Sequence, residues 1–170
     1  MALHDTSKFT GIHLEADELI KKHKFFKEDF GKFQPIGALD NMHTLANDPA
    51  PTDIFGLLRN VSKSAYVLFD DLKRHRDPKN NLATYALKRP TKSQTVVFNR
   101  CLRELKEQLI IITAKTTDMA NPIPKNTYLI NPALLKCREI TATEAMWDIL
   151  VKLEAERKLA LLKKTISVDN

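Results

Sequence analysis

Hydrophobic and polar residues alternate along much of the chain with the spacing of amphipathic helices. Apolar positions recur every three or four residues over 14–30, 52–76 and 93–108, and again from 141 to 164. This spacing places apolar side chains on one face of a helix. The pattern therefore predicts a helix in each of these four segments.

Two runs before the last helix have a different character. Residues 109–113 are rich in β-branched side chains, and residues 127–130 are again apolar, with a polar loop at 114–126 between them. Such runs are typical of strands, so the pair is predicted to form a β-hairpin. The short apolar segment 81–88, which precedes a tight turn at 89–92, is interpreted as a further short helix.

The order helix, short helix, turn, helix, strand, loop and strand is that of a winged helix-turn-helix domain. The predicted fold class is mainly α with a small β-hairpin. An N-terminal aromatic-rich arm at 1–51 precedes the winged-helix domain at 52–138, and a C-terminal helix follows at 139–170. The apolar stripe at 142–160 needs a partner. We expect a second copy in a homodimer, although the chain's own N-terminal arm could also cover it.

The net charge of +6 is concentrated in the middle of the chain. Residues 52–138 hold sixteen Lys and Arg against seven Asp and Glu, a net +9, whereas both ends are slightly acidic. A basic centre of this kind is typical of a surface that binds nucleic acid. A solvated basic face without a partner is the alternative.

Several classes of function lack their residues. The four glycines do not have the spacing of a phosphate-binding loop, and the five histidines do not have the spacing of metal ligands. We therefore predict no catalytic residue, no metal, no cofactor and no enzyme activity. No apolar run is long enough to span a membrane and no signal peptide is recognised. Cys101 and Cys137 are expected to be reduced thiols of a cytoplasmic protein.

The candidate DNA contacts lie on the helix at 93–108, at its start, and in the loop between the strands. A helix fits the major groove, where long polar side chains reach base edges. Residues at its start are placed for phosphate, and loop lysines for the neighbouring backbone. The predicted DNA-binding residues are Lys92, Ser93, Thr95, Asn99, Arg100, Arg103, Lys106, Lys115 and Lys125. An ordinary solvated helix face is the alternative interpretation.

Two motifs resemble known families. Within Asn81–Ile112, the runs Thr91-Lys92-Ser93-Gln94-Thr95 and Leu102-Arg103-Glu104-Leu105-Lys106-Glu107 resemble the bacterial winged-helix stretch that contains the recognition helix, although Gln108 stands where a glycine is usual. The segment Asn126-Thr127-Tyr128-Leu129-Ile130-Asn131-Pro132 is similar to the one that follows the wing in RepL-type plasmid replication proteins. Ala133-Leu134-Leu135 replaces the aromatic residues expected next, and the wing is longer and contains prolines.

The resemblance covers about half of the chain, Thr52–Arg138, and implies an initiator that binds an origin and recruits host replication proteins. We therefore expect sequence-specific binding of double-stranded DNA by a plasmid or phage replication initiator or regulator. One alternative is a phage or bacterial transcriptional regulator, with host transcription proteins as partners. A second is a winged-helix module that binds a host protein instead of DNA.

Overall fold

The computed structural model describes residues 7–30, 58, 60–116 and 119–168. The helices are α1 (Ser7–Phe25), the π-helical turn η1 (Phe26–Phe30), α4 (Lys63–His75), α5 (Lys92–Glu107) and α6 (Ile140–Val168). The strands are β1 (Leu82–Thr84), β2 (Ile111–Thr113) and β3 (Thr127–Ile130). The described part is thus mainly helical with one small antiparallel sheet. This content of helix and strand agrees with the predicted class, mainly α with a small β-hairpin.

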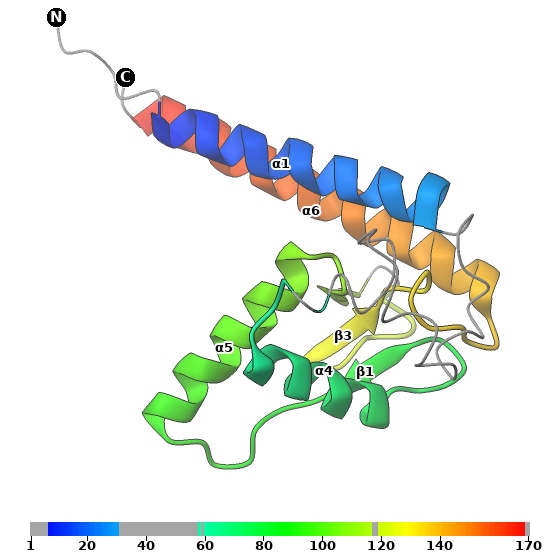
Figure 1. Ribbon diagram of the computed structural model, residues 1–170. Coiled ribbons are helices and arrows are strands. Elements are labelled where there is room, and N and C mark those ends of the chain that lie inside the picture. The colour runs from blue at the N-terminus through cyan, green and yellow to red at the C-terminus, as the bar shows by residue number, and fades with distance from the viewer. Residues whose placement is uncertain (1–6, 31–57, 59, 117–118, 169–170) are drawn as a thin grey trace, which may run out of the picture.

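The sheet has the order β1-β3-β2, so β3 is the central strand. Leu129 of β3 pairs with Leu82 on one side and with Ile112 on the other, and all four residues of β3 are buried. In Figure 1 the sheet lies between α4 on one side and the long pair of α1 and α6 on the other. Cover on both sides explains why this strand has no polar face.

The short helix predicted at 81–88 is wrong. Leu82–Thr84 forms β1, which pairs with β3, and no helix is found in 85–91. Asn81 has a left-handed backbone (φ 61°) that turns the chain into this strand. A short apolar run fits a strand or a helix equally well, and here the neighbouring β3 supplies the hydrogen-bond partners. The predicted hairpin is therefore part of a three-stranded sheet.

The helix predicted over 52–76 is not continuous, since Leu58 is helical but is separated from α4 by a break. Residues 60–62 are not helical, and α4 begins at Lys63 with Ser62 as N-cap, whose hydroxyl accepts a hydrogen bond from the Ala65 N–H at 3.2 Å. A capping hydroxyl satisfies one of the free amides of the first turn. The start signal proposed at Thr52 and Asp53 lies outside the described residues.

Helix α5 has well-formed ends on both sides. Thr91, and not Ser93, is its N-cap and forms a capping box with Gln94. At the other end the N–H groups of Leu109 and Ile110 donate to the carbonyls of Lys106 and Leu105, both at 3.0 Å. This is a Schellman motif, whose left-handed residue is usually glycine. Here that residue is Leu109 (φ 52°), one position after Gln108, where the glycine was expected.

Helix α1 packs along α6, so the N-terminal arm covers part of the C-terminal helix. The two run antiparallel in Figure 1, with the start of α1 near the end of α6. Asp148 of α6 lies 3.2 Å from His23 Nε2 and 2.6 Å from Lys27 Nζ. The hydrophobic core is continuous through all three predicted segments, because Leu19, Leu129 and Trp147 belong to the same buried cluster.

Candidate nucleic-acid interface

The outward face of α5 carries most of the DNA contacts that the sequence predicts. Cys101, Leu102 and Leu105 bury one side of the helix. On the other side its first turns are open to solvent: every residue from Lys92 to Val97 is exposed, and so are Asn99, Arg100 and Arg103. This end of α5 also projects from the body of the protein in Figure 1. The helix therefore has one face open to solvent and another packed against the hydrophobic core.

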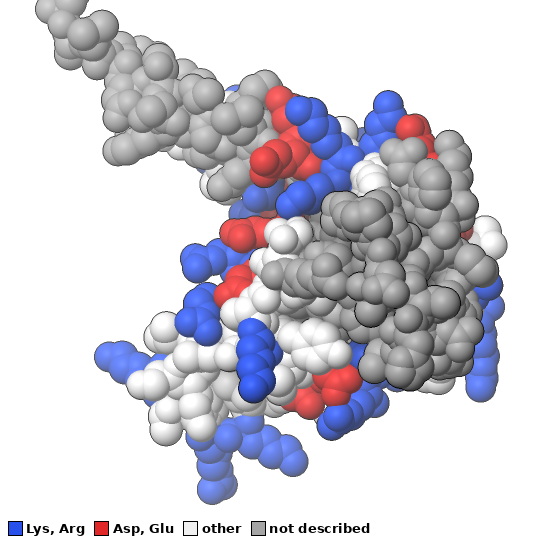
Figure 2. Space-filling model, viewed as in Figure 1, with Lys and Arg blue, Asp and Glu red and all other residues white. Residues whose placement is uncertain are grey.

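The same region is uniformly basic. Between Asp77 and Glu104 the sequence has no acidic residue and six Lys or Arg. Figure 2 shows Lys and Arg around the projecting end of α5. Farther along, Arg100 Nε is 3.5 Å from Glu104, and Arg103 Nε is 4.0 Å from Glu107. Exposed pairs of this kind are worth less than about 1 kcal/mol, so either guanidinium can exchange its carboxylate for a phosphate.

Two contacts fix α5 relative to the other helices. The Glu104 carboxylate accepts a hydrogen bond of 2.7 Å from the Ser62 N–H at the start of α4. Lys22 of α1 donates to the carbonyl of Glu107 at 2.6 Å, where the helix dipole attracts a cation. The C-terminal half of α5 is thus tied to both α4 and α1, while its N-terminal half has the exposed face.

The predicted contacts at the start of α5 are exposed. Lys92 and Ser93 occupy the first turn, where free amides favour an anion. The Thr95 hydroxyl donates to the Thr91 carbonyl at 3.1 Å and so is engaged within the helix start. Val96 was missed, although it follows Lys92 and precedes Arg100 by four residues. It is 66% exposed in the middle of this face.

Lys106 is placed differently from the other candidates. It is half-buried, and its ammonium lies 5.6 Å from the centre of the Tyr128 ring, in the range of a cation–π contact. Burial lowers the pKa of Lys106, with Glu154 opposing this and Arg157 and Lys115 adding to it. Lys106 therefore lies between the sheet and α6 and not on the outward face. Tyr128 is buried.

The two loop lysines, Lys115 and Lys125, are exposed. The charge of Lys115 acts on both Lys106 and Glu154, so this end of the loop lies toward α6. Burial opposes ionisation of Glu154, but hydrogen bonds from Arg157 at 2.6 and 3.0 Å, together with the charges of Arg157, Lys158 and Lys115, outweigh it and lower the pKa of Glu154. Arg157 thus extends the basic region onto a helix that sequence reasoning assigned only to dimerisation.

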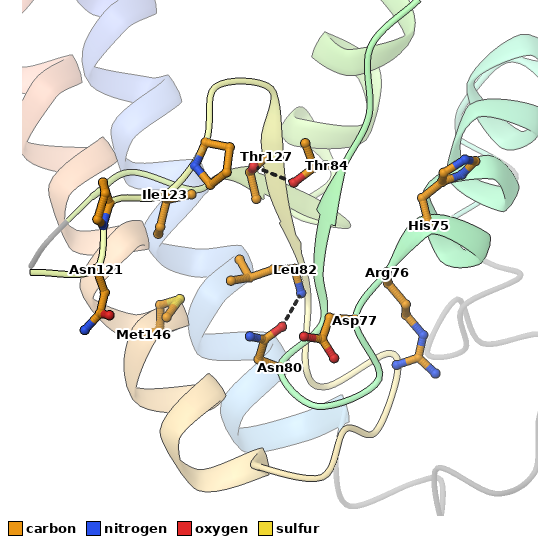
Figure 3. Close-up of a pocket in the computed structure, with 12 residues that line it drawn as sticks. His75, Arg76, Asp77, Asn80, Leu82, Thr84, Asn121, Ile123, Thr127 and Met146 are labelled. Atoms are coloured by element: carbon orange, nitrogen blue, oxygen red, sulfur yellow. Dashed lines mark hydrogen bonds between the residues drawn. The ribbon is translucent and has the colours of Figure 1, made fainter.

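A cavity of about 650 Å³ lies between β1, the loop segment 121–124 and Met146 of α6 (Figure 3). Its polar groups are engaged within the chain. Arg76 donates to the Asn81 side chain and to the Lys136 carbonyl, and the Thr84 and Thr127 hydroxyls bond each other at 2.8 Å. The arrangement stabilises the sheet edge and offers few free groups to a ligand.

Asn131, which begins the Asn-Pro pair of the segment 126–132, has a structural role. Asn131 is buried, and its amide donates to the carbonyl of Leu109 at 2.9 Å, while its side-chain oxygen accepts from the Ala133 N–H at 3.0 Å. It therefore joins the end of β3 to the left-handed turn after α5. The predicted DNA contacts that are exposed lie elsewhere, on α5 and in the loop between β2 and β3.

Comparison with known proteins gives no relative: no protein-family model, curated protein or solved structure matches the chain. Within the described residues, no group of three or more His, Cys, Asp or Glu could hold a metal ion. No helix in the described ranges is long and apolar enough to cross a membrane.

Proposed function

We propose that the protein binds double-stranded DNA in a sequence-specific way, with α5 in the major groove. The observation that carries the proposal is the exposed face of α5, on which Lys92, Asn99, Arg100 and Arg103 project outward and which has no acidic residue before Glu104. A helix of 16 residues is about 24 Å long, enough to lie across a groove about 12 Å wide. Arg and Asn are the side chains best suited to guanine and adenine edges there.

The connectivity supports a winged-helix interpretation. The order α4, β1, α5, β2, β3 with sheet order β1-β3-β2 is that of winged-helix domains, in which the helix before the strand pair is the recognition helix. One element departs from it, since the segment 85–91 takes the place of the helix that would precede α5. In this proposal Lys115 and Lys125 of the loop, with Arg157 beside them, contact the phosphate backbone.

A replication initiator or regulator of a plasmid or phage is the proposed role, and a transcriptional regulator of similar origin uses the same contacts. We propose that two copies act together through the C-terminal helix in the cytoplasm, with host replication or transcription proteins as further partners. The identity of the bound DNA separates the two roles. Fragments of the source genome selected by binding would come from an origin in one case and from promoters in the other.

The binding face is tested by substitution. We expect Arg100→Ala with Arg103→Ala to lower affinity for the selected duplex by about 10- to 100-fold in fluorescence anisotropy, with unchanged melting. Lys21→Ala with Lys24→Ala on α1 removes the same charge from another exposed surface and is the matched control. Wild-type affinity should also fall steeply with salt. Equal losses in both variants, or no wild-type binding at low salt, would overturn the proposal.

Docking of a host protein is the second candidate, and the exposed valines favour it. Val96 and Val97 are 66% and 41% exposed on the first turns of α5, where an apolar contact could form as well as a DNA contact. In that case the wild-type protein would bind no duplex at low salt, while Val96→Ala would weaken the protein complex.

A further inference from the structure

Helix α6 has two apolar faces. Trp147, Leu150, Val151 and Ala155 are buried in the core cluster. On the other side Ile149 is 50% exposed and Leu153 is 40% exposed. Ala142 and Ala160 are exposed in line with them, which gives a second apolar stripe with spacings of seven, four and seven residues. This second stripe holds four of the five residues of the stripe that the sequence assigned to a dimer, whereas the fifth, Met146, packs against the core.

Charges of both signs lie along one flank of the second stripe. Lys152, Glu156 and Lys163 are exposed, and they are four and seven residues apart. Helical periodicity places all three on the same side of the stripe. Within the described part of the chain, no ion pair engages any of them. The flank therefore has a cation and an anion, one helical turn apart, available to a partner.

We propose that the partner is a second copy, whose α6 packs antiparallel on this stripe about a two-fold axis level with Glu154. Lys152 and Glu156 lie two residues before and two residues after that point. The axis therefore places Lys152 opposite the partner's Glu156 and Glu156 opposite the partner's Lys152, which gives two reciprocal ion pairs. Self-complementarity of one patch is the property of a two-fold interface.

The charges also favour the antiparallel orientation over the parallel one. A parallel two-fold copy would bring this flank against the opposite flank of the partner's stripe. The exposed charged residues on that opposite flank are Arg157 and Lys164, which are both basic. In a parallel pair residues at the same height face each other, so Arg157 would lie beside the partner's Glu156 and Lys164 beside the partner's Lys163, and one attraction would be offset by one repulsion.

The same antiparallel register suits the apolar residues. It brings Ile149 beside the partner's Ala160, and Leu153 beside the partner's Leu153 near the axis. Small residues against large ones let two helices approach closely and exclude water. The interface depends on the proposed function only for its purpose, which is to place two α5 helices on one duplex. It can therefore fail while DNA binding stands, and the reverse also holds.

The first test is the oligomeric state without DNA. In sedimentation equilibrium we expect wild-type protein to dimerise at about 10 μM, and Leu153→Glu to raise the dimer dissociation constant by about 100-fold, because a carboxylate enters an apolar contact. Leu161→Glu is the matched control, since Leu161 is on the same helix, is 45% exposed and lies off the stripe. Circular dichroism melting shows that each variant remains folded.

The second test fixes the register by mixing two variants. Lys152→Glu alone sets two carboxylates against each other at both contacts, and Glu156→Lys alone sets two ammonium groups against each other. Each variant should therefore dimerise about tenfold more weakly than wild type. An equimolar mixture of the two should recover wild-type affinity, because every contact again joins opposite charges. In each variant positions 152 and 156 have the same sign, so this rescue cannot arise within a single chain.

Lys164→Glu makes the same charge change on the opposite flank of the stripe and should leave the dimer nearly unchanged. A monomeric wild type at about 100 μM, equal loss with Leu161→Glu, or no rescue in the mixture would overturn the interface. Binding of Leu153→Glu to a duplex with one half-site tests the DNA-binding function separately.

Discussion

The Glu104 carboxylate on α5 accepts a hydrogen bond of 2.7 Å from the backbone N–H of Ser62, the N-cap residue of α4. The hydrogen bond from Ser62 holds the pKa of Glu104 below its usual 4.5. The contact joins the two helices where one begins and the other ends. It therefore sets the position of α5, from which the proposed DNA contacts project.

Removal of this carboxylate should loosen α5. We expect Glu104→Ala to lower the free energy of unfolding by about 1 kcal/mol at pH 7, and Glu104→Gln to lower it by less because an acceptor oxygen remains. Since the folded-state pKa is depressed, the carboxylate stabilises fully above pH 4.5 and loses its effect as the pH falls through the lower folded value. Urea unfolding at pH 7 and pH 3 checks this.

Glu107→Ala is the control for that measurement, because Glu107 is exposed on the same helix. It should change stability by less than about 0.5 kcal/mol. A loss for Glu104→Ala no larger than for the control would show that the Ser62 contact does not stabilise the protein.

At Leu109, the left-handed residue after α5, a glycine substitution should destabilise the protein less than an alanine substitution. This is the reverse of the usual order within a helix. Leu109 is only 1% exposed, so both Leu109→Ala and Leu109→Gly lose about 2–5 kcal/mol of packing. Glycine adopts φ near 52° at no cost, whereas alanine pays about 1 kcal/mol there. We therefore expect Leu109→Gly to be the more stable of the two in urea unfolding.

Leu105 is the matched control, since it is fully buried within α5. There Leu105→Ala should be more stable than Leu105→Gly by about 1 kcal/mol, as in any helix interior. The same order at both positions would contradict a left-handed Leu109.

If α5 reads the major groove, Val96 should contact thymine methyl groups. We expect the wild type to bind its selected duplex about fourfold more tightly than the same duplex with uracil in place of thymine, since a lost methyl removes about 0.8 kcal/mol of apolar contact. In Val96→Ala the ratio should approach one. Val67→Ala, at an exposed position of α4, should keep the wild-type ratio. Competition anisotropy measures both, and equal wild-type affinities would exclude the contact.

The packing of α1 on α6 should depend on pH through His23. Burial lowers the pKa of this imidazole below 6.5, with Asp148 opposing it and Lys27 adding to it. The unfolded chain therefore binds the proton more readily than the folded protein. The stability due to His23 is complete above pH 6.5 and is lost as the pH falls through the lower folded-state pKa.

Melting temperatures between pH 7.5 and 5.5 test this dependence. We expect the wild type to melt at lower temperature as the pH falls, and His23→Asn to depend less on pH. His75→Asn, at an exposed histidine of α4, should keep the wild-type slope. Identical pH profiles for the wild type and His23→Asn would contradict the assignment.

The sequence by itself determined the elements whose signal is local. The periodicity around Cys101, Leu102 and Leu105 predicted α5 within one residue at each end, and the apolar runs predicted β2 and β3. The absence of acidic residues from Pro78 to Arg103 is likewise a property of the sequence alone. These features depend on neighbours within a few residues, so a short window contains all the information they need.

Only the tertiary structure decided which surfaces meet. Leu82–Thr84 is a strand because β3 lies beside it, and Lys106 is half-buried because Tyr128 and α6 enclose it. The apolar stripes of α6 look alike in the sequence, yet α1 and the core bury only one of them. Pairing and burial depend on residues far apart in the chain, so no local pattern contains them.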